Sequence, residues 1–127
     1  MTVPEKSALT LISDPPRFEA EELEAFKKPV TVKKGHKAVY KLSYVGREPL
    51  KVQWYLDGEE LSDESNIKIE HSEGSSRLLL LKLQRKDSGE VKIKLKNEFG
   101  TMEAYSQLIV LGRYQVDFED ARLYIYL

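Results

Sequence analysis

The sequence predicts an all-β fold, a two-layer antiparallel sandwich. Three observations lead to this prediction: apolar residues recur with period two after Pro29, turn-forming residues separate these runs at short intervals, and no helical pattern lies between them. About seven or eight short strands joined in this way pack as two facing sheets. A chain of 127 residues is long enough for one such domain, with roughly two dozen residues left over at its ends.

The alternation can be followed from strand to strand. In the run at 51–56, Val52, Trp54 and Leu56 alternate with polar or amphipathic neighbours, so these three side chains are expected to face the core. The Asp57-Gly58 pair then marks a hairpin turn, because glycine accepts the positive φ that tight turns need. The expected strands cover residues 38–45, 51–56, 67–69, 78–83, 91–95 and 106–110.

The N-terminal quarter has a different character. Residues 1–17 contain three prolines and no sustained period, and we predict a linker there. The following segment, FEAEELEAF at 18–26, is rich in helix-forming residues. We expect an acidic connector with one or two helical turns, which packs Phe18 and Phe26 on the edge of the domain.

Composition excludes several classes of function. The chain has 20 basic and 21 acidic residues, so its balance of charge does not indicate a nucleic-acid partner. It has no cysteine, which excludes disulfides, thiolate metal sites and a thiol nucleophile. Small secreted β-domains usually carry disulfides, so a reducing, cytoplasmic location is expected. Neither a signal peptide nor an apolar run of about 18 residues is present, and we expect no membrane partner.

Catalytic motifs are also missing from the sequence. His36 and His71 stand beside turn residues with no metal-binding or acid–base pattern around them. There is no phosphate-binding glycine loop and no nucleophile motif. We therefore predict that the protein is not an enzyme and needs neither a cofactor nor a metal.

Several motifs, taken in order, resemble the intermediate set (I-set) of immunoglobulin domains over residues 15–111. One motif, Asp87-Ser88-Gly89, is preceded by leucines at positions 78, 80 and 83. The motifs are Pro15-Pro16-Arg17-Phe18, Gly35, Trp54-Tyr55-Leu56-Asp57-Gly58, Asp87-Ser88-Gly89 and Asn97-Glu98-Phe99-Gly100. The resemblance implies an immunoglobulin-like domain over residues 18–112, with 113–127 as a C-terminal extension.

The resemblance also assigns a core. Trp54 corresponds to the core tryptophan of the family, and the two family cysteines fall at Leu42 and Ile93. The sandwich therefore lacks the inter-sheet disulfide, and we expect Trp54, Leu42 and Ile93 to be buried in mutual contact. The arginine that often pairs with the family aspartate is Asn66 here, so Asp87 must find another partner or remain solvated.

Cysteine-poor I-set domains of this kind resemble those of intracellular muscle and cytoskeletal scaffolds, such as titin, obscurin, myomesin, myosin-binding protein C and palladin. The resemblance implies a non-catalytic protein-binding and spacer module at the sarcomere or cytoskeleton, with scaffold or filament proteins as partners. An extracellular adhesion domain is disfavoured by the absence of cysteine.

Two faces of the expected sandwich are candidate partner-binding surfaces. If Leu78 and Leu80 point inward, Leu79 and Leu81 point outward, and an apolar outer face needs a cover. The other face carries a basic stripe, which is either a filament (actin) binding site or a solvated surface that discourages aggregation. The stripe consists of Lys92, Lys94 and Lys96, with Lys51 on the neighbouring strand.

The C-terminal segment 113–127, RYQVDFEDARLYIYL, is rich in aromatic and branched residues, unlike a disordered end. Three interpretations remain open: an added strand or segment that binds the same or another copy as a homodimer, a helical connector, or a segment whose partner is missing. The first predicts that Phe118, Leu123 and Ile125 are buried. Its candidate partner-binding residues are Tyr114, Val116, Phe118, Leu123, Tyr124 and Ile125, together with Leu79 and Leu81.

Overall fold

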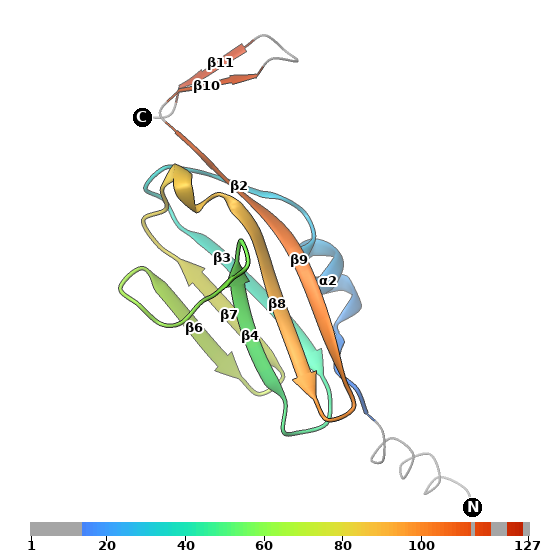
Figure 1. Cartoon of the computed structure of the whole chain (residues 1–127). Coiled ribbons are helices and arrows are strands. Elements are labelled where there is room, and N and C mark those ends of the chain that lie inside the picture. The colour runs from blue at the N-terminus through green and yellow to red at the C-terminus, as the bar shows by residue number, and fades with distance from the viewer. Residues whose placement is uncertain (1–13, 113, 118–121, 126–127) are drawn as a thin grey trace, which may run out of the picture.

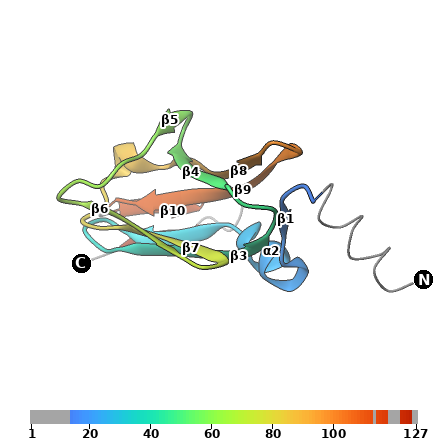
Figure 2. The same cartoon turned by 90° about the horizontal axis from the view of Figure 1, so that it is seen from below.

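The computed structural model describes residues 14–112, 114–117 and 122–125. Two sheets pack face to face, and Figure 2 shows them edge-on as two layers. The first sheet has the order β1-β3-β7-β6, and the second has the order β2-β9-β8-β4-β5. The predicted two-layer, mainly antiparallel sandwich is confirmed.

Every strand pair of the sandwich is antiparallel except one, in which β2 runs parallel to β9. The strands of the first sheet are β1 (Arg17–Phe18), β3 (Ala38–Val45), β7 (Ser75–Leu80) and β6 (Ile67–Ser72). The strands of the second sheet are β2 (Val30–Lys33), β9 (Gly100–Leu111), β8 (Gly89–Asn97), β4 (Lys51–Leu56) and β5 (Glu59–Glu60). A 3-10 turn, η1 (Arg85–Asp87), precedes β8.

The core lies between the two sheets and follows the predicted alternation. Along β3 the burial of side chains alternates residue by residue, and β8 and β9 behave in the same way. Burying such apolar side chains is the main favourable contribution to folding. The core consists of Phe26, Ala38, Tyr40, Leu42, Tyr44, Trp54, Leu78, Leu80, Leu83, Val91, Ile93, Leu95, Ala104, Leu108 and Val110.

One helix, α2 (Ala20–Phe26), interrupts the β structure near the N-terminus. The Glu19 side chain caps it by accepting a hydrogen bond of 2.7 Å from the Glu22 N–H, and acidic residues in the first turn suit the helix dipole. The expectation that Phe26 packs on the domain edge is wrong. It is a core residue, with ring centroids 5.7 Å from Tyr40 and 6.1 Å from Trp54.

The folded part of the chain begins before the expected linker boundary at residue 17. Pro16 is buried, and Arg17 lies opposite Val45 in the β1–β3 pair. The Asp14 carbonyl accepts a hydrogen bond of 2.9 Å from the side-chain amide of Asn97. Residues 14–17 therefore pack on the sandwich, while residues 1–13 of the expected linker lie outside the described residues.

The C-terminal segment contains two strands, β10 (Tyr114–Asp117) and β11 (Arg122–Ile125), which pair antiparallel with each other. Their period of two favours strands over a helix, so the helical-connector interpretation is wrong for these residues. The two strands form a sheet of their own and add no strand to the sandwich. Phe118 lies outside the described residues.

The chain enters and leaves the sandwich at opposite ends, as Figure 1 shows. It enters beside the turn after β3, where the Arg47 N–H donates to the Asp14 carbonyl at 3.1 Å. It leaves at the end of β9, where the Leu111 carbonyl accepts from the Lys34 N–H at 2.9 Å. The β10–β11 hairpin lies beyond this second end.

Candidate interaction surfaces

The three residues expected in the core are placed there by β3, β4 and β8. Trp54 is 1% exposed, while Leu42 and Ile93 have no exposed surface. Trp54 and Ile93 are direct cross-strand neighbours. Aliphatic packing therefore occupies the region in which the family has its disulfide, and each such side chain contributes about 1.5–3 kcal/mol through burial.

Asp87 does find a partner. Its Oδ2 accepts a hydrogen bond of 2.8 Å from the Gln84 N–H, and its Oδ1 lies 3.6 Å from Lys86 Nζ. The carboxylate thus closes the η1 turn instead of pairing with an arginine.

The basic stripe is less exposed than expected. Lys92 and Lys94 are half-buried, and of the four lysines only Lys96 and Lys51 are exposed. Lys92 Nζ lies 4.4 Å from the centroid of the Tyr55 ring and 3.9 Å from Glu103 Oε2. The Glu103 carboxylate therefore offsets the charge at one end of the stripe, and the Tyr55 ring partly covers it.

The other three lysines remain close to one another on the outer face of the second sheet. Lys51 lies directly opposite Lys96, and Lys94 lies opposite Glu103 in the register of β8 and β9. Among the described residues, Lys51, Lys94 and Lys96 have no acidic group within ion-pair distance. Their charge is available to an acidic partner.

The apolar face expected on the first sheet is smaller than the sequence suggests. Leu79 is half-buried and lies opposite Val39, which is 42% exposed. The neighbouring row is charged, with Arg77 paired to Glu70 at 3.8 Å. Leu79 and Val39 therefore form a small apolar spot instead of a continuous face.

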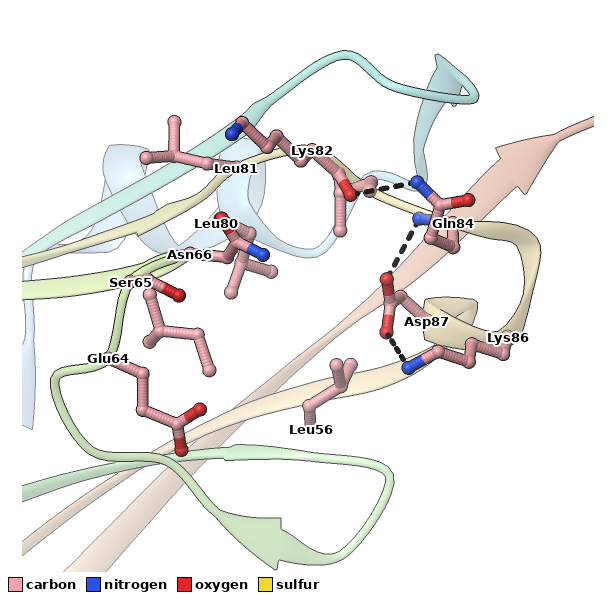
Figure 3. A pocket seen from close by; sticks show the side chains of 12 residues that line it. Leu56, Glu64, Ser65, Asn66, Leu80, Leu81, Lys82, Gln84, Lys86 and Asp87 are labelled. Carbon is pink, nitrogen blue, oxygen red and sulfur yellow. Dashed lines mark hydrogen bonds and ion pairs between the residues drawn. The ribbon is translucent and has the colours of Figure 1, made fainter.

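Leu81 does not extend this apolar spot. It follows the end of β7, where its N–H donates to the Asn66 carbonyl at 2.8 Å, and it lines a cavity of about 480 Å³. Figure 3 shows Leu56 and Leu80 in this cavity beside the Gln84–Asp87 hydrogen bond. No side chain of the cavity within the described residues has a buried polar atom without a partner, so nothing in it indicates a ligand.

Two buried polar features lie inside the sandwich. The Trp54 indole N–H donates to Ser76 Oγ at 2.8 Å, and Ser76 Oγ lies 3.0 Å from His71 Nδ1. Burial raises the pKa of Tyr40 from its ordinary value of 10.0 to about 12, and its hydroxyl oxygen has no hydrogen-bond partner among the described residues. The neighbouring Ser106 hydroxyl donates to the Lys28 carbonyl at 3.0 Å.

None of these features assembles reactive groups. The described residues contain no cluster of His, Asp and Glu side chains that could hold a metal ion. Within the same part of the chain, no helix has the length and apolar character needed to cross a membrane.

The arrangement of strands, the core tryptophan and the replaced cysteine positions define the class of protein as an immunoglobulin-like sandwich. The chain matches the immunoglobulin I-set domain family over residues 21–110, and it belongs to that family. As an I-set domain resembling those of titin and unc-89, it is a non-catalytic module.

The relatives are very large muscle proteins. The chain is 37% identical over 75 residues to the muscle M-line assembly protein unc-89 of Caenorhabditis elegans. This match covers 58% of this chain and 1% of that protein. It is 28% identical over 81 residues to titin of Drosophila melanogaster. This second match covers 64% of this chain and, to the nearest per cent, 0% of titin. The chain thus spans about 1% or less of the length of these relatives.

A solved complex of the titin M10 domain with an obscurin-like 1 immunoglobulin domain has a similar structure. The TM-score is 0.69 at 26% sequence identity, and the match covers 79% of this chain and 97% of the matched chain.

Proposed function

We propose that the protein is a protein-binding and spacer module of a sarcomeric or cytoskeletal scaffold inside the cell, and that its domain at 18–112 self-associates through the extension at 113–127. The relatives support the scaffold setting, since one is named an M-line assembly protein and another is titin. The titin domain seen in complex with a second immunoglobulin domain supports a protein partner.

The positions of the two ends of the described chain support the role of spacer. The chain enters at one end of the sandwich and leaves at the other, so consecutive modules of this kind follow one another in line. The packed core without a disulfide keeps such a module folded in a reducing compartment.

The β10–β11 hairpin is the feature that supports self-association. A single two-stranded hairpin is marginally stable in water, because it buries little apolar surface and each ordered residue costs about 1–2 kcal/mol of backbone entropy. Each of its strands pairs on one side with the other and with no strand of the sandwich. A second surface is needed to stabilise it, and a two-fold homodimer is the commonest closed solution.

The test is the mass of the protein in solution, measured by light scattering over a range of concentrations. The full chain is expected to be a dimer, and a chain truncated after Gly112 is expected to be a folded monomer. Ile125→Asp should weaken the dimer, whereas Gln115→Asp, which adds the same charge at a polar position of the hairpin, should have a smaller effect. A full chain that is monomeric at high micromolar concentration would contradict self-association.

A second candidate function is binding to an acidic filament such as actin. The unpaired charge of Lys51, Lys94 and Lys96 favours it. In cosedimentation with actin filaments, replacing these three residues by glutamate should abolish binding, while Lys68→Glu on the other sheet should not. Salt should weaken this binding steeply, because screening acts on exposed charges. Strong binding that is indifferent to salt would contradict this mechanism.

A further inference from the structure

The helix α2 leaves part of a strand edge open. β1 covers β3 at its C-terminal end alone, where Arg17 lies opposite Val45 and Phe18 opposite Tyr44. Immediately afterwards the chain turns into α2, which packs beside β3 and adds no strand to the sheet. Among the described residues, the first half of β3 therefore has β7 as a neighbour on one side and no strand on the other.

The direction of the backbone groups along β3 follows from two hydrogen bonds. The Tyr44 N–H donates toward the β7 side, to the Gly74 carbonyl at 2.9 Å. The Ser43 N–H donates toward the opposite side, to Glu22 Oε1 of α2 at 2.7 Å. Because these directions alternate along an antiparallel strand, the N–H and C=O groups of Lys41 and Val39 also point to the open side.

Glu22 ends the open edge at Ser43, since its carboxylate occupies the position that a neighbouring carbonyl would take. Within the described part of the chain, the backbone groups of Lys41 and Val39 on this side have no hydrogen-bond partner. Both residues are exposed, and beside them lies a cavity of about 200 Å³ whose lining includes Ala25, Phe26 and Val30. An exposed strand edge beside a hollow lined by both apolar and charged side chains is a template for an added strand.

We infer that this open edge of β3, at Val39–Lys41, receives one strand of the β10–β11 hairpin from a second copy of the chain. The inference rests on the proposed self-association and names its receiving surface. Each strand of the hairpin has one side without a partner among the described residues, and its sequence is rich in tyrosine and branched residues that suit strands. The hairpin supplies a free strand, and the open edge of β3 lacks a neighbouring strand.

The positions of the two elements favour exchange between copies. The hairpin follows β9 at the end of the sandwich where Leu111 lies opposite Lys33, and β3 starts after the next turn at the same end. In Figure 1 the hairpin extends beyond this end and does not run alongside β3 of its own copy. If each copy gives its hairpin to the other, the two contacts are equivalent and the assembly closes as a two-fold dimer.

The decisive variant is Lys41→Pro. Proline removes an N–H that the sandwich does not use, and an edge strand tolerates it there, but the edge can no longer donate to an added strand. The matched control is Lys41→Thr, which removes the charge and keeps the N–H. We expect Lys41→Pro to raise the dissociation constant of the dimer by at least about tenfold, or about 1.4 kcal/mol, and Lys41→Thr to leave it unchanged.

The outcomes are distinguishable. If truncation after Gly112 gives a monomer while Lys41→Pro remains a dimer, the hairpin binds elsewhere, so the inference is wrong and the proposed self-association stands. If both position-41 variants weaken the dimer equally, the charge is responsible and the edge is not. If the full chain is itself monomeric, the proposed self-association is wrong, and this inference is wrong with it.

A second measurement covers the case in which Lys41→Pro does not fold. Isotope-labelled protein truncated after Gly112 is mixed with unlabelled full chain, and the amide signals of the labelled copy are followed by nuclear magnetic resonance. The signals of Val39 and Lys41 should shift with full chain and not with unlabelled truncated protein. Unchanged signals overturn the inference. So does slow amide exchange at these residues in a monomeric full chain, since the hairpin then binds its own copy.

Discussion

At Trp54 the indole N–H is buried among apolar side chains, where a donor without an acceptor is costly. Ser76, itself 1% exposed, supplies that acceptor, and its hydroxyl also forms a hydrogen bond with the ring of the exposed His71. The serine therefore stabilises the core tryptophan from the opposite sheet, and its hydroxyl links the two layers at the centre of the sandwich.

Ser76→Ala should lower the free energy of unfolding by about 1–3 kcal/mol, because the Trp54 N–H is left without its partner. Ser72→Ala is the control, since Ser72 is an exposed serine of the same sheet, and it should change stability by no more than about 0.5 kcal/mol. Urea unfolding followed by fluorescence measures both, because Trp54 is the single tryptophan of the chain. Equal stability of the two variants would contradict the role of Ser76.

The hydroxyl group of Tyr40 makes the stability sensitive to alkaline pH. Burial raises its pKa to about 12, so the folded state keeps the neutral phenol while the unfolded state begins to lose its proton near pH 10. This contribution to stability is complete below pH 10 and is lost as the pH rises toward 12. Tyr40→Phe should remove that part of the alkaline decline, as measured by thermal unfolding at pH 8 and at pH values above 10.

Tyr40→Phe should not be destabilising at neutral pH. The Tyr40 oxygen is a buried polar atom without a hydrogen-bond partner among the described residues, so its removal relieves a desolvation cost. A large loss of stability at neutral pH, or an alkaline decline identical to that of the unchanged protein, would contradict this account.

At the scale of elements, α2 is the feature that departs most from the predicted sandwich. Its acidic sequence indicates a solvent-facing connector, and its first turn is acidic and has no buried residue. Its last residue differs, because Phe26 enters the core between Tyr40 and Trp54. One large side chain thus fixes the helix to the sandwich, beside the edge of β3.

Phe26→Ala should cost about 3–5 kcal/mol of stability, the range for removing a large aromatic side chain from a packed core. Glu24→Ala, on the exposed face of the same helix, removes a surface ion pair with Lys27 at 3.3 Å and should cost about 0.5 kcal/mol or less. Chemical unfolding of both variants compares the two faces of the helix. A Phe26→Ala variant as stable as Glu24→Ala would show that the helix does not depend on its core contact.

For the whole molecule, stability depends on packing and not on oxidation state. The chain has no cysteine, so its melting temperature should be the same in buffers with and without a reductant. A disulfide-containing immunoglobulin domain, measured in the same two buffers, is the control and should lose stability in reductant. A shift in the melting temperature of this protein between the two buffers would contradict the independence of its stability from reductant.

The period of two along the chain determined the strands, and with them the burial of Trp54, Leu42 and Ile93. Those inferences succeed because alternation is local: a strand has two faces, and its own sequence shows which face is apolar. The turn at Asp57-Gly58 follows from local chemistry in the same way, since Asp57 and Gly58 both have positive φ angles.

Other properties were decided by the tertiary structure alone. The sequence does not show that Glu103 and Tyr55 partly cover Lys92, because these neighbours come from other strands. Nor does it show that Phe26 is a core residue or that Val39 and Lys41 border an open edge, since both depend on where α2 lies relative to β3. Exposure and free hydrogen-bonding groups depend on residues that are distant along the chain, and packing in three dimensions brings them together.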